Sequence, residues 1–268
     1  MRLKITHVTS YSYDAPVRSA LQKLRLTPRS GHGQTVLDWD VSITGGTRQV
    51  SYADQFVNHT DLIKVDPGAQ HIEIVCQGHV ETENRNGVIG IHKGFAPLWL
   101  YRNATPFTAP GSTLRALVRQ LKADHGDADA LTQLHALSDM ILGQVRYETG
   151  RTDSSTTAET ALAEGHGVCQ DHTHVMIAAA RLLGQPARYI SGYLMMNDRV
   201  DQTASHAWCE VWTDALGWVG FDVSNGISPD DRYVRVATGR DYRDAAPIMG
   251  IRQGAGDEHL QVSLQVQQ

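Results

Sequence analysis

Residues 165–174, GHGVCQDHTH, place three histidines, one aspartate and one cysteine within ten positions. The stretch leads into an alanine-rich run, and Gly184 and Pro186 follow that run as helix stop signals. The pattern predicts one helix over residues 168–183 with Cys169 in its first turn. Three interpretations of the stretch compete, namely a metal site, a nucleophile with its partners, and a polar helix start.

A zinc site is the first interpretation to test, since three histidines of this stretch and Cys169 are possible ligands. Each helical residue advances about 100°, so His172 and His174 would point roughly 160° apart. The helix has no HxxxH pair, and the sequence has no second ligand group with finger-like spacing. We therefore expect no metal and no cofactor.

The three cysteines differ in their sequence surroundings. Cys76 and Cys209 lie inside predicted strands among apolar neighbours, which is typical of buried thiols. Cys169 stands at a predicted helix N-terminus shortly after two glycines, where free N–H groups and the helix dipole favour a thiolate. Three cysteines cannot all pair and none lies in a CxxC, so a disulfide scaffold is not expected.

A cysteine nucleophile needs a base and a residue that orients the base. The predicted hairpin SHAWCEVWTDALGWVGFDVSNG carries His206 and Asp222 on its two strands. A turn centred on Asp214 would place them directly opposite, with Cβ atoms about 4.5–5.5 Å apart. A turn centred one residue later would leave them as diagonal neighbours on the same face. Either register predicts an imidazole–carboxylate pair, whereas an even-numbered loop would separate the two side chains.

The remaining sequence predicts an α+β protein in two parts. Short stretches with period-2 character, separated by turn signals, predict a β-sandwich-like domain over residues 1–95. The segment FAPLWLYRNATPFTAPG holds three of the nine prolines and precedes a helical region, so the core is expected over residues 96–268. The C-terminal HLQVSLQVQQ alternates strictly and predicts a half-buried strand that closes a sheet.

Composition and charge limit the partners and the compartment. The chain has 268 residues and a net charge of −5, which gives no electrostatic case for nucleic acid or an anionic membrane. The N-terminal MRLKITHVTSYSYD lacks the apolar stretch of about 7–15 residues that a secretory signal needs. No segment approaches the roughly 20 apolar residues of a membrane span. We expect a cytoplasmic protein, and the sequence predicts no oligomeric state.

Several blocks of the sequence resemble the bacterial transglutaminase-like cysteine peptidase superfamily. The blocks GHGVCQDHTHVMIAAARLLGQPARYISGYL, SHAWCEVW and GWVGFDVSNG are similar to its core. The stretches THVTSYSYDAPV, LRLTPRS and GHVETE resemble the β domain that precedes this core in one bacterial branch, and ATGRDYRDAAPIMG resembles that branch's closing segment. The resemblance implies a papain/transglutaminase-like core, with the nucleophile at a helix N-terminus packed on an antiparallel sheet.

The resemblance also implies a site and a chemistry. Cys169 would be the nucleophile, His206 the general base and acid, and Asp222 the residue that orients His206. The expected activity is hydrolysis of amide, peptide or isopeptide bonds through a thioester, with a peptide or protein amide as substrate. Acyl transfer from glutamine to an amine is the alternative, ahead of a non-catalytic or zinc-binding module.

Three further residues are weaker candidates for substrate binding. Trp208 lies two residues after His206, and Tyr242 lies in the segment that resembles the family's closing part. His172 lies one helical turn after Cys169 and could tune the thiol or line a cleft. A buried structural role is the favoured alternative for His172 and His174, and core packing for Trp208. The role of His166 stays open.

Overall fold

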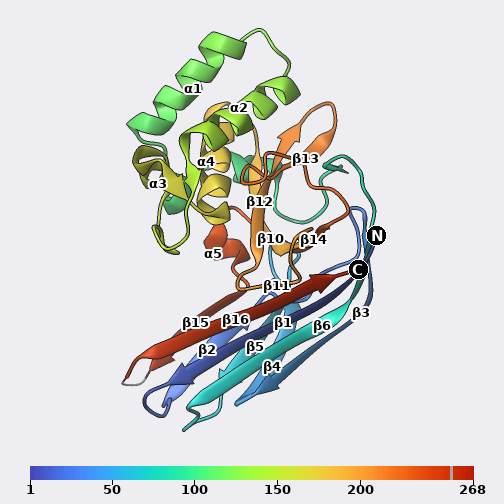
Figure 1. The fold of residues 1–268 in the computed structure, drawn as a ribbon, viewed down its shortest axis with the longest axis vertical. Coiled ribbons are helices and arrows are strands. Elements are labelled where there is room, and N and C mark those ends of the chain that lie inside the picture. Colours follow the sequence, from blue (N-terminus) through green and yellow to red (C-terminus); the bar gives the residue numbers. More distant parts are fainter. Residues whose placement is uncertain (254–255) are drawn as a thin grey trace.

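The computed structural model describes residues 1–253 and 256–268, and it divides into a β sandwich and a helical core with its own sheet (Figure 1). Within the described residues, no helix is both long enough and apolar enough to cross a membrane. The predicted α+β fold is confirmed.

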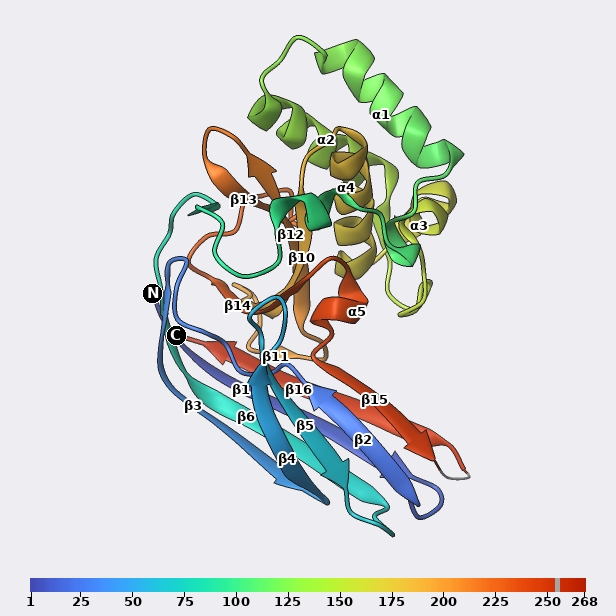
Figure 2. The same ribbon diagram turned by 180° about the vertical axis from the view of Figure 1, so that it is seen from behind.

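Two antiparallel sheets form the sandwich. The first sheet has the strand order β11 (Asp201–Gln202), β16 (Glu258–Gln267), β1 (Arg2–Tyr13), β6 (His71–Thr82) and β3 (Gln34–Thr44). The second has the order β15 (Ile248–Gln253), β2 (Ser19–Leu24), β5 (His59–Val65) and β4 (Gly46–Ala53). Figure 2, the view from behind, shows the second sheet in front of the first.

The sandwich forms because its strands alternate between buried and exposed residues. In β6, every second side chain is buried, and Ile72, Ile74 and Cys76 are completely inaccessible to solvent. These side chains meet Ile63 and Val65 of β5 in one apolar cluster between the sheets. The period-2 pattern in the sequence therefore identified the inner face of this layer.

The C-terminal strands belong to the sandwich and not to the core. β16 pairs antiparallel with β1, from Lys4 opposite Gln267 to Tyr13 opposite Glu258, and β15 pairs with β2. The sequence division at residue 95 placed both strands in the core, so the structure corrects it at this end. Strand pairing depends on which sheet edges are open, and the local sequence does not encode that information.

The core sheet has the order β14 (Tyr233–Gly239), β10 (Ala187–Leu194), β12 (His206–Thr213), β13 (Gly217–Phe221) and β7 (Val88–Gly90). Its strands are antiparallel, as the resemblance implied. A separate parallel pair joins β8 (Arg146–Tyr147) to β9 (His166–Gly167), immediately before the helix that carries Cys169.

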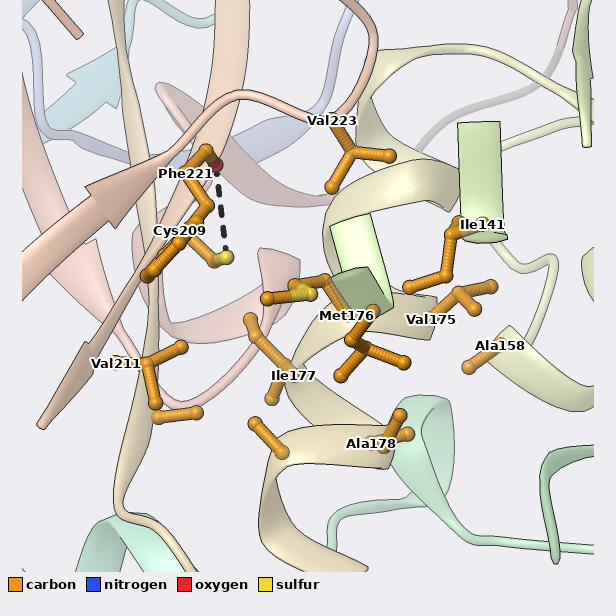
Figure 3. Packing of buried hydrophobic residues seen from close by; sticks show 14 of the residues in the cluster. Ile141, Ala158, Val175, Met176, Ile177, Ala178, Cys209, Val211, Phe221 and Val223 are labelled. Atoms are coloured by element: carbon orange, nitrogen blue, oxygen red, sulfur yellow. Dashed lines mark hydrogen bonds between the residues drawn. The ribbon is translucent and has the colours of Figure 1, made fainter. Parts of the chain in front are cut away.

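The helix α4 (Cys169–Leu182) lies at the centre of the core. All its side chains from Asp171 to Arg181 are buried, which is typical of a helix packed on every side. Figure 3 shows Met176 and Ile177 turned toward Cys209 and Val211 of β12. The alanine-rich middle allows this close approach to the sheet. α4 is therefore held on all sides, and its N-terminus has a fixed position.

Three helices pack against α4, namely α1 (Ser112–His125), α2 (Ala130–Gln144) and α3 (Ala158–Glu164). The short α5 (Tyr242–Ala245) packs against β10 and β14, while the 3-10 turns η1 (Leu98–Arg102) and η2 (Pro106–Thr108) contact β10 and α4 respectively. The apolar stripe of α1 is buried, from Leu114 to Leu121. Glu159 of α3 accepts hydrogen bonds from the backbone N–H groups of Thr113 (2.7 Å) and Leu114 (3.1 Å), and so caps α1 across the core.

Candidate active site

Cys169 is the first residue of α4, as the sequence predicts. The Asp171 carboxylate fixes the start of the helix, because it accepts hydrogen bonds from the Val168 N–H (2.8 Å) and the Thr152 hydroxyl (2.7 Å). A side chain at Gly167 would meet the Asp171 Cβ at 2.6 Å, so only glycine fits there. Asp171 therefore fixes the N-terminus of α4, while Cys169 stays partly accessible to solvent.

The hairpin brings His206 and Asp222 together. Of the two turn positions that the sequence allows, the structure has the later one. Trp212 pairs with Trp218 and Cys209 with Phe221, so the turn is centred on Ala215 and not on Asp214. The loop is odd-numbered, and both side chains therefore lie on one face as diagonal neighbours. His206 Nε2 donates a hydrogen bond to Asp222 Oδ2 over 2.6 Å.

Asp222 is completely buried, and four groups donate hydrogen bonds to it. Besides His206, its Oδ2 accepts from the Tyr233 hydroxyl (2.7 Å) and the Asn225 side-chain amide (2.7 Å). The Asn225 backbone N–H donates to Oδ1 over 3.4 Å. Burial acts to raise the pKa of Asp222, but these hydrogen bonds and the charge of His206 outweigh burial and lower the pKa. The carboxylate is therefore held ionised and in one orientation.

Sequence reasoning missed Tyr233 and Asn225. Tyr233 begins β14, whose sequence YVRVATG alternates in the way that predicts a strand, so its position on the core sheet was detectable. Asn225 lies in the turn after Asp222, where Asp222 forms a bridge with Ile227. A turn asparagine has no signal that separates this role from ordinary turn formation.

The environment of His206 favours its charged form. Burial acts to lower the pKa of His206, but hydrogen bonds with Asp222 and Cys169, together with their charges, raise it to about 10. Asp222 occupies Nε2, so Nδ1 is the ring nitrogen left for Cys169. The imidazolium thus lies between the Asp222 carboxylate, which Nε2 contacts, and the Cys169 thiol, which is left to Nδ1.

Cys169 and His206 open onto a cleft of about 420 Å³. Tyr147, Thr149 and Val168 line it beside Cys169, and Ser224 and Asn225 line it beside Asp222. The segment between β10 and β12 forms the opposite wall, with contributions from Met196, Arg199, Gln202, Thr203, Ala204 and Ser205. An extended polypeptide could enter along this wall and present a carbonyl to Cys169.

The three histidines of residues 165–174 have structural roles. His172 donates from Nε2 to the Val145 carbonyl (2.8 Å) and accepts at Nδ1 from the Ser224 hydroxyl (2.7 Å). It is fully buried and does not line the cleft, and burial lowers its pKa. His166 lies against Glu164, with Nδ1 3.0 Å from its carbonyl oxygen.

His174 is also fully buried, and its Nε2 accepts from the Tyr242 backbone N–H over 3.1 Å. Its ring stacks on Phe107 with centroids 5.2 Å apart. Burial and the nearby charge of Arg181 lower the pKa of His174 to about 3. His174 is therefore neutral and ties α4 to α5.

Neither Trp208 nor Tyr242 lines the cleft. Trp208 is 1% exposed and lies behind His206, with the two ring centroids 6.2 Å apart. Its indole also meets the Tyr233 ring edge-on. Tyr242 is half-buried on α5 against Tyr189. The structure thus makes Trp208 a support for the imidazole ring and places Tyr242 away from the cleft.

In residues 1–253 and 256–268, His, Cys, Asp and Glu side chains form no group of three or more that could hold a metal ion. The thiol, the imidazole and the carboxylate of the Cys–His–Asp arrangement can supply a nucleophile, an acid–base group and its orientation for acyl transfer.

Both parts of the chain are similar to known protein families. Residues 115–223, which contain Cys169, His206 and Asp222, match the transglutaminase-like superfamily, and residues 3–81 match the bacterial transglutaminase-like N-terminal region. The chain is therefore similar to the transglutaminase-like core over residues 115–223 and to the bacterial N-terminal region over residues 3–81, and the resemblance seen in the sequence is confirmed.

Individual relatives cover nearly the whole chain. An uncharacterized protein of Mycobacterium leprae is 29% identical over 280 residues, which cover 99% of this chain and 98% of the relative. An uncharacterized protein of Mycobacterium tuberculosis is 29% identical over 276 residues, covering 93% and 87%. A crystal structure named as a putative cysteine protease from Cytophaga hutchinsonii superposes with a TM-score of 0.76 at 20% identity, covering 100% of this chain and 98% of that one. This likeness establishes the fold.

Proposed function

We propose that the protein is a cysteine-dependent hydrolase of amide or peptide bonds. The observation that carries the proposal is the alignment of Cys169, His206 and Asp222 at the end of a cleft, with Nε2 of His206 2.6 Å from Asp222. The name of the Cytophaga structure agrees with this reaction class. Both termini of α4 are fixed by packing, so the nucleophile is held in place before substrate arrives.

Acylation begins from the thiolate–imidazolium pair. The Cys169 thiolate attacks the amide carbonyl carbon, a C–S bond forms, and the carbonyl electron pair moves to oxygen. The Cys169 backbone N–H, at the first position of α4, is a donor for this oxyanion. The oxyanion collapses, the C–N bond breaks, and the leaving amine takes the Nδ1 proton of His206. A thioester and a neutral imidazole remain.

Deacylation returns the proton. Neutral His206 removes a proton from water, and the hydroxide attacks the thioester carbonyl. The C–S bond then breaks, the carboxylic acid product leaves, and the thiolate–imidazolium pair is restored. Asp222 keeps Nε2 protonated through both steps, so Nδ1 is always the nitrogen that exchanges a proton.

Water is the proposed acceptor, in preference to an amine. A transamidase needs a shielded apolar channel for the alkyl stem of the amine, because water at about 55 M otherwise hydrolyses the thioester. Three tryptophans of the hairpin could have formed such a channel. Only Trp208 lies beside His206, and it is 1% exposed. Trp218 instead packs against Tyr101, and Trp212 packs on Trp218.

The test measures both products from one thioester. The enzyme is incubated with a panel of amide and isopeptide substrates and millimolar labelled cadaverine, and free acid and labelled amide are quantified by mass spectrometry. We expect mainly free acid, and no product from Cys169→Ala. Cys76→Ala, which removes a buried thiol of the sandwich, is the matched control and should retain activity. A predominance of labelled amide would contradict hydrolysis, and an active Cys169→Ala protein would contradict the nucleophile.

A further inference from the structure

A second cavity, of about 440 Å³, lies between loops of the sandwich and the core sheet. We call it the basic groove. Its cationic lining consists of Arg29, Lys93, Arg188 and Arg235, and its apolar lining includes Phe56, Val57, Phe95 and Val236. It shares no lining residue with the cleft at Cys169. The proposed chemistry therefore leaves the basic groove unexplained.

The charge of the basic groove is opposite to that of the whole chain. The protein carries a net charge of −5, yet no aspartate or glutamate among the described residues lines this cavity. Like charges gathered in a concave surface repel one another and focus a positive potential into it. Such an arrangement is favourable when an anion occupies the cavity.

The base of the groove is a rigid ion cluster. Glu210, completely buried on β12, accepts from Arg188 Nε (2.6 Å) and Arg235 Nε (2.6 Å). Burial acts to raise the pKa of Glu210, but the two guanidinium groups lower it to about 2. The Arg188 guanidinium also lies 4.0 Å above the ring of Trp218. Glu210 compensates one of the two charges, so the base of the groove keeps an excess positive charge in a fixed position.

The rim adds two cations that have no carboxylate partner. Arg29 and Lys93 are exposed, and neither forms an ion pair with any other described residue. Arg29 donates to the Val57 carbonyl, which holds the guanidinium at the mouth. His32 contributes no charge near neutral pH, because burial and the charge of Arg235 lower its pKa to about 4. The positive charge of the groove therefore persists across the physiological pH range.

The wall of the groove is held in a conformation that costs energy. Val57 has φ 67°, and a β-branched residue in this left-handed region is rare and strained. Its N–H donates to the Asp54 carbonyl over 2.9 Å. The neighbouring Asn58 binds both the N–H (2.8 Å) and the carbonyl (2.7 Å) of Thr238 on β14. These bonds join the sandwich loop to the core and preorganise the groove.

We propose that the basic groove is a binding site for an anion with two or more negative charges, carried by carboxylate or phosphate groups on a partly apolar body. Arg29, Lys93 and the Arg188–Arg235 pair would bind the charged groups by charge-assisted hydrogen bonds. Phe95, 83% exposed at the rim, would cover the apolar part. This function is separate from acyl transfer at Cys169 and does not depend on it.

The experiment is a titration of the full chain by calorimetry at low ionic strength, with two probes. Pyrophosphate supplies phosphate groups, and the peptide acetyl-Phe-Glu-Glu-Glu-amide supplies carboxylates. The Cys169→Ala protein is used throughout, so that peptide hydrolysis cannot contribute heat. We expect saturable binding of at least one probe, with affinity that falls as salt is added. Binding of only one probe supports the proposal and identifies the anionic group.

The test variant is Arg29→Gln/Lys93→Gln, whose two positions are exposed and outside the buried ion cluster. We expect affinity to fall about tenfold, since each exposed charge contributes modestly. The matched control, Arg119→Gln/Lys122→Gln, also removes one arginine and one lysine charge, but from the exposed face of α1, and it should change affinity less than twofold. The proposal is overturned if neither probe binds saturably or if both variants weaken binding equally.

Discussion

His206, which is half-buried, and His174, which is fully buried, both lie beside α4, yet their surroundings have opposite electrostatic effects. His206 lies between the Asp222 carboxylate and the Cys169 thiol, and its pKa is raised to about 10. His174 has only the Arg181 cation as a charged neighbour, and its pKa is lowered to about 3. Near neutral pH one ring is charged and the other is neutral. The same side chain is therefore suited to the proposed proton transfer in one place and to packing in the other.

Proximity in sequence is therefore a weak guide to the chemistry of a histidine in this protein. His172 and His174 lie within five residues of Cys169, but both are held by neutral hydrogen-bond partners away from the cleft. The ring that contacts Cys169 comes from a strand 37 positions later and carries a buried carboxylate partner. The partner of each imidazole, and not its distance along the chain, defines its role.

The largest effect that can test this comparison is on turnover. His206→Ala removes the only imidazole that contacts Cys169, so kcat should fall about 10³-fold, a magnitude typical of a lost general acid–base group. His174→Ala should lower the melting temperature and leave kcat of the folded protein within about threefold. Steady-state kinetics and circular dichroism of both variants measure this. Equal losses of kcat would mean that the two histidines do not differ in role.

The second effect is on thiol reactivity. Cys76 and Cys209 are inaccessible, and burial raises the pKa of both, that of Cys76 to about 12. Cys169 faces the cleft beside a charged His206. We expect iodoacetamide to label Cys169 about 10³-fold faster than the other two at pH 7. Peptide mapping after brief alkylation measures the three rates, and His206→Ala should reduce only that of Cys169. Comparable labelling of all three would argue against an activated thiol.

The third effect concerns the carboxylate that sets the state of His206. Asp222→Asn should preserve the fold and lower kcat about 10²-fold, because an amide cannot stabilise the imidazolium or fix its tautomer. Tyr233→Phe, which removes one donor to Asp222 and leaves its charge, should cost less than tenfold. The pH–rate profile of each variant provides a readout that loss of packing alone would not shift. A fully active, folded Asp222→Asn protein would contradict this positioning role.

The effect that is smallest near neutral pH is the pH dependence of stability produced by His174. Its folded-state pKa of about 3 lies below the ordinary value near 6.5, so between these pH values only the unfolded chain binds the proton. The free energy of unfolding should therefore fall as pH drops from 6.5 to 3, with a contribution of up to about 1.4 kcal/mol per pH unit. At pH 7 this effect is absent. Urea unfolding at several pH values measures the slope.

His174→Gln should flatten that slope, because the glutamine amide does not titrate. The matched control is His71→Gln, at an exposed position of β6, which should leave the slope unchanged. If the wild-type protein and His174→Gln lose stability in parallel, then His174 is not the neutral buried ring described above.

Local patterns in the sequence predicted much of the site. The helix stop signals and the alanine-rich run located α4 to within one residue at each end. The predicted hairpin located β12 and β13, and the parity of its loop brought His206 and Asp222 to one face. These features depend on interactions between near neighbours, which a single sequence records. Even so, the turn centre lay at Ala215, because several turns of three residues fit the same composition.

Features that depend on distant partners were not predictable. Thr157 caps α3, the helix it begins, whereas Glu159 of the same helix caps α1. A carboxylate accepts hydrogen bonds from whichever free N–H groups the fold brings near it. The local sequence does not predict which helix will provide those N–H groups. The pairing of β16 with β1 could not be predicted for the same reason, although the sequence correctly predicted that β16 is a strand.

In the sequence, the core lies between strands that belong to the sandwich, since β15 and β16 follow it and β1 to β6 precede it. This order has a consequence for producing either part as a separate fragment. β1 is a central strand only because β16 covers one of its edges, and β2 is covered by β15 in the same way. A fragment made of residues 1–95 would expose the backbone N–H and C=O groups of both strands along two long edges. Such edges recruit strands from other molecules, and the fragment should therefore aggregate where the whole chain does not. The two parts differ in chemistry, but they share a single unit of folding.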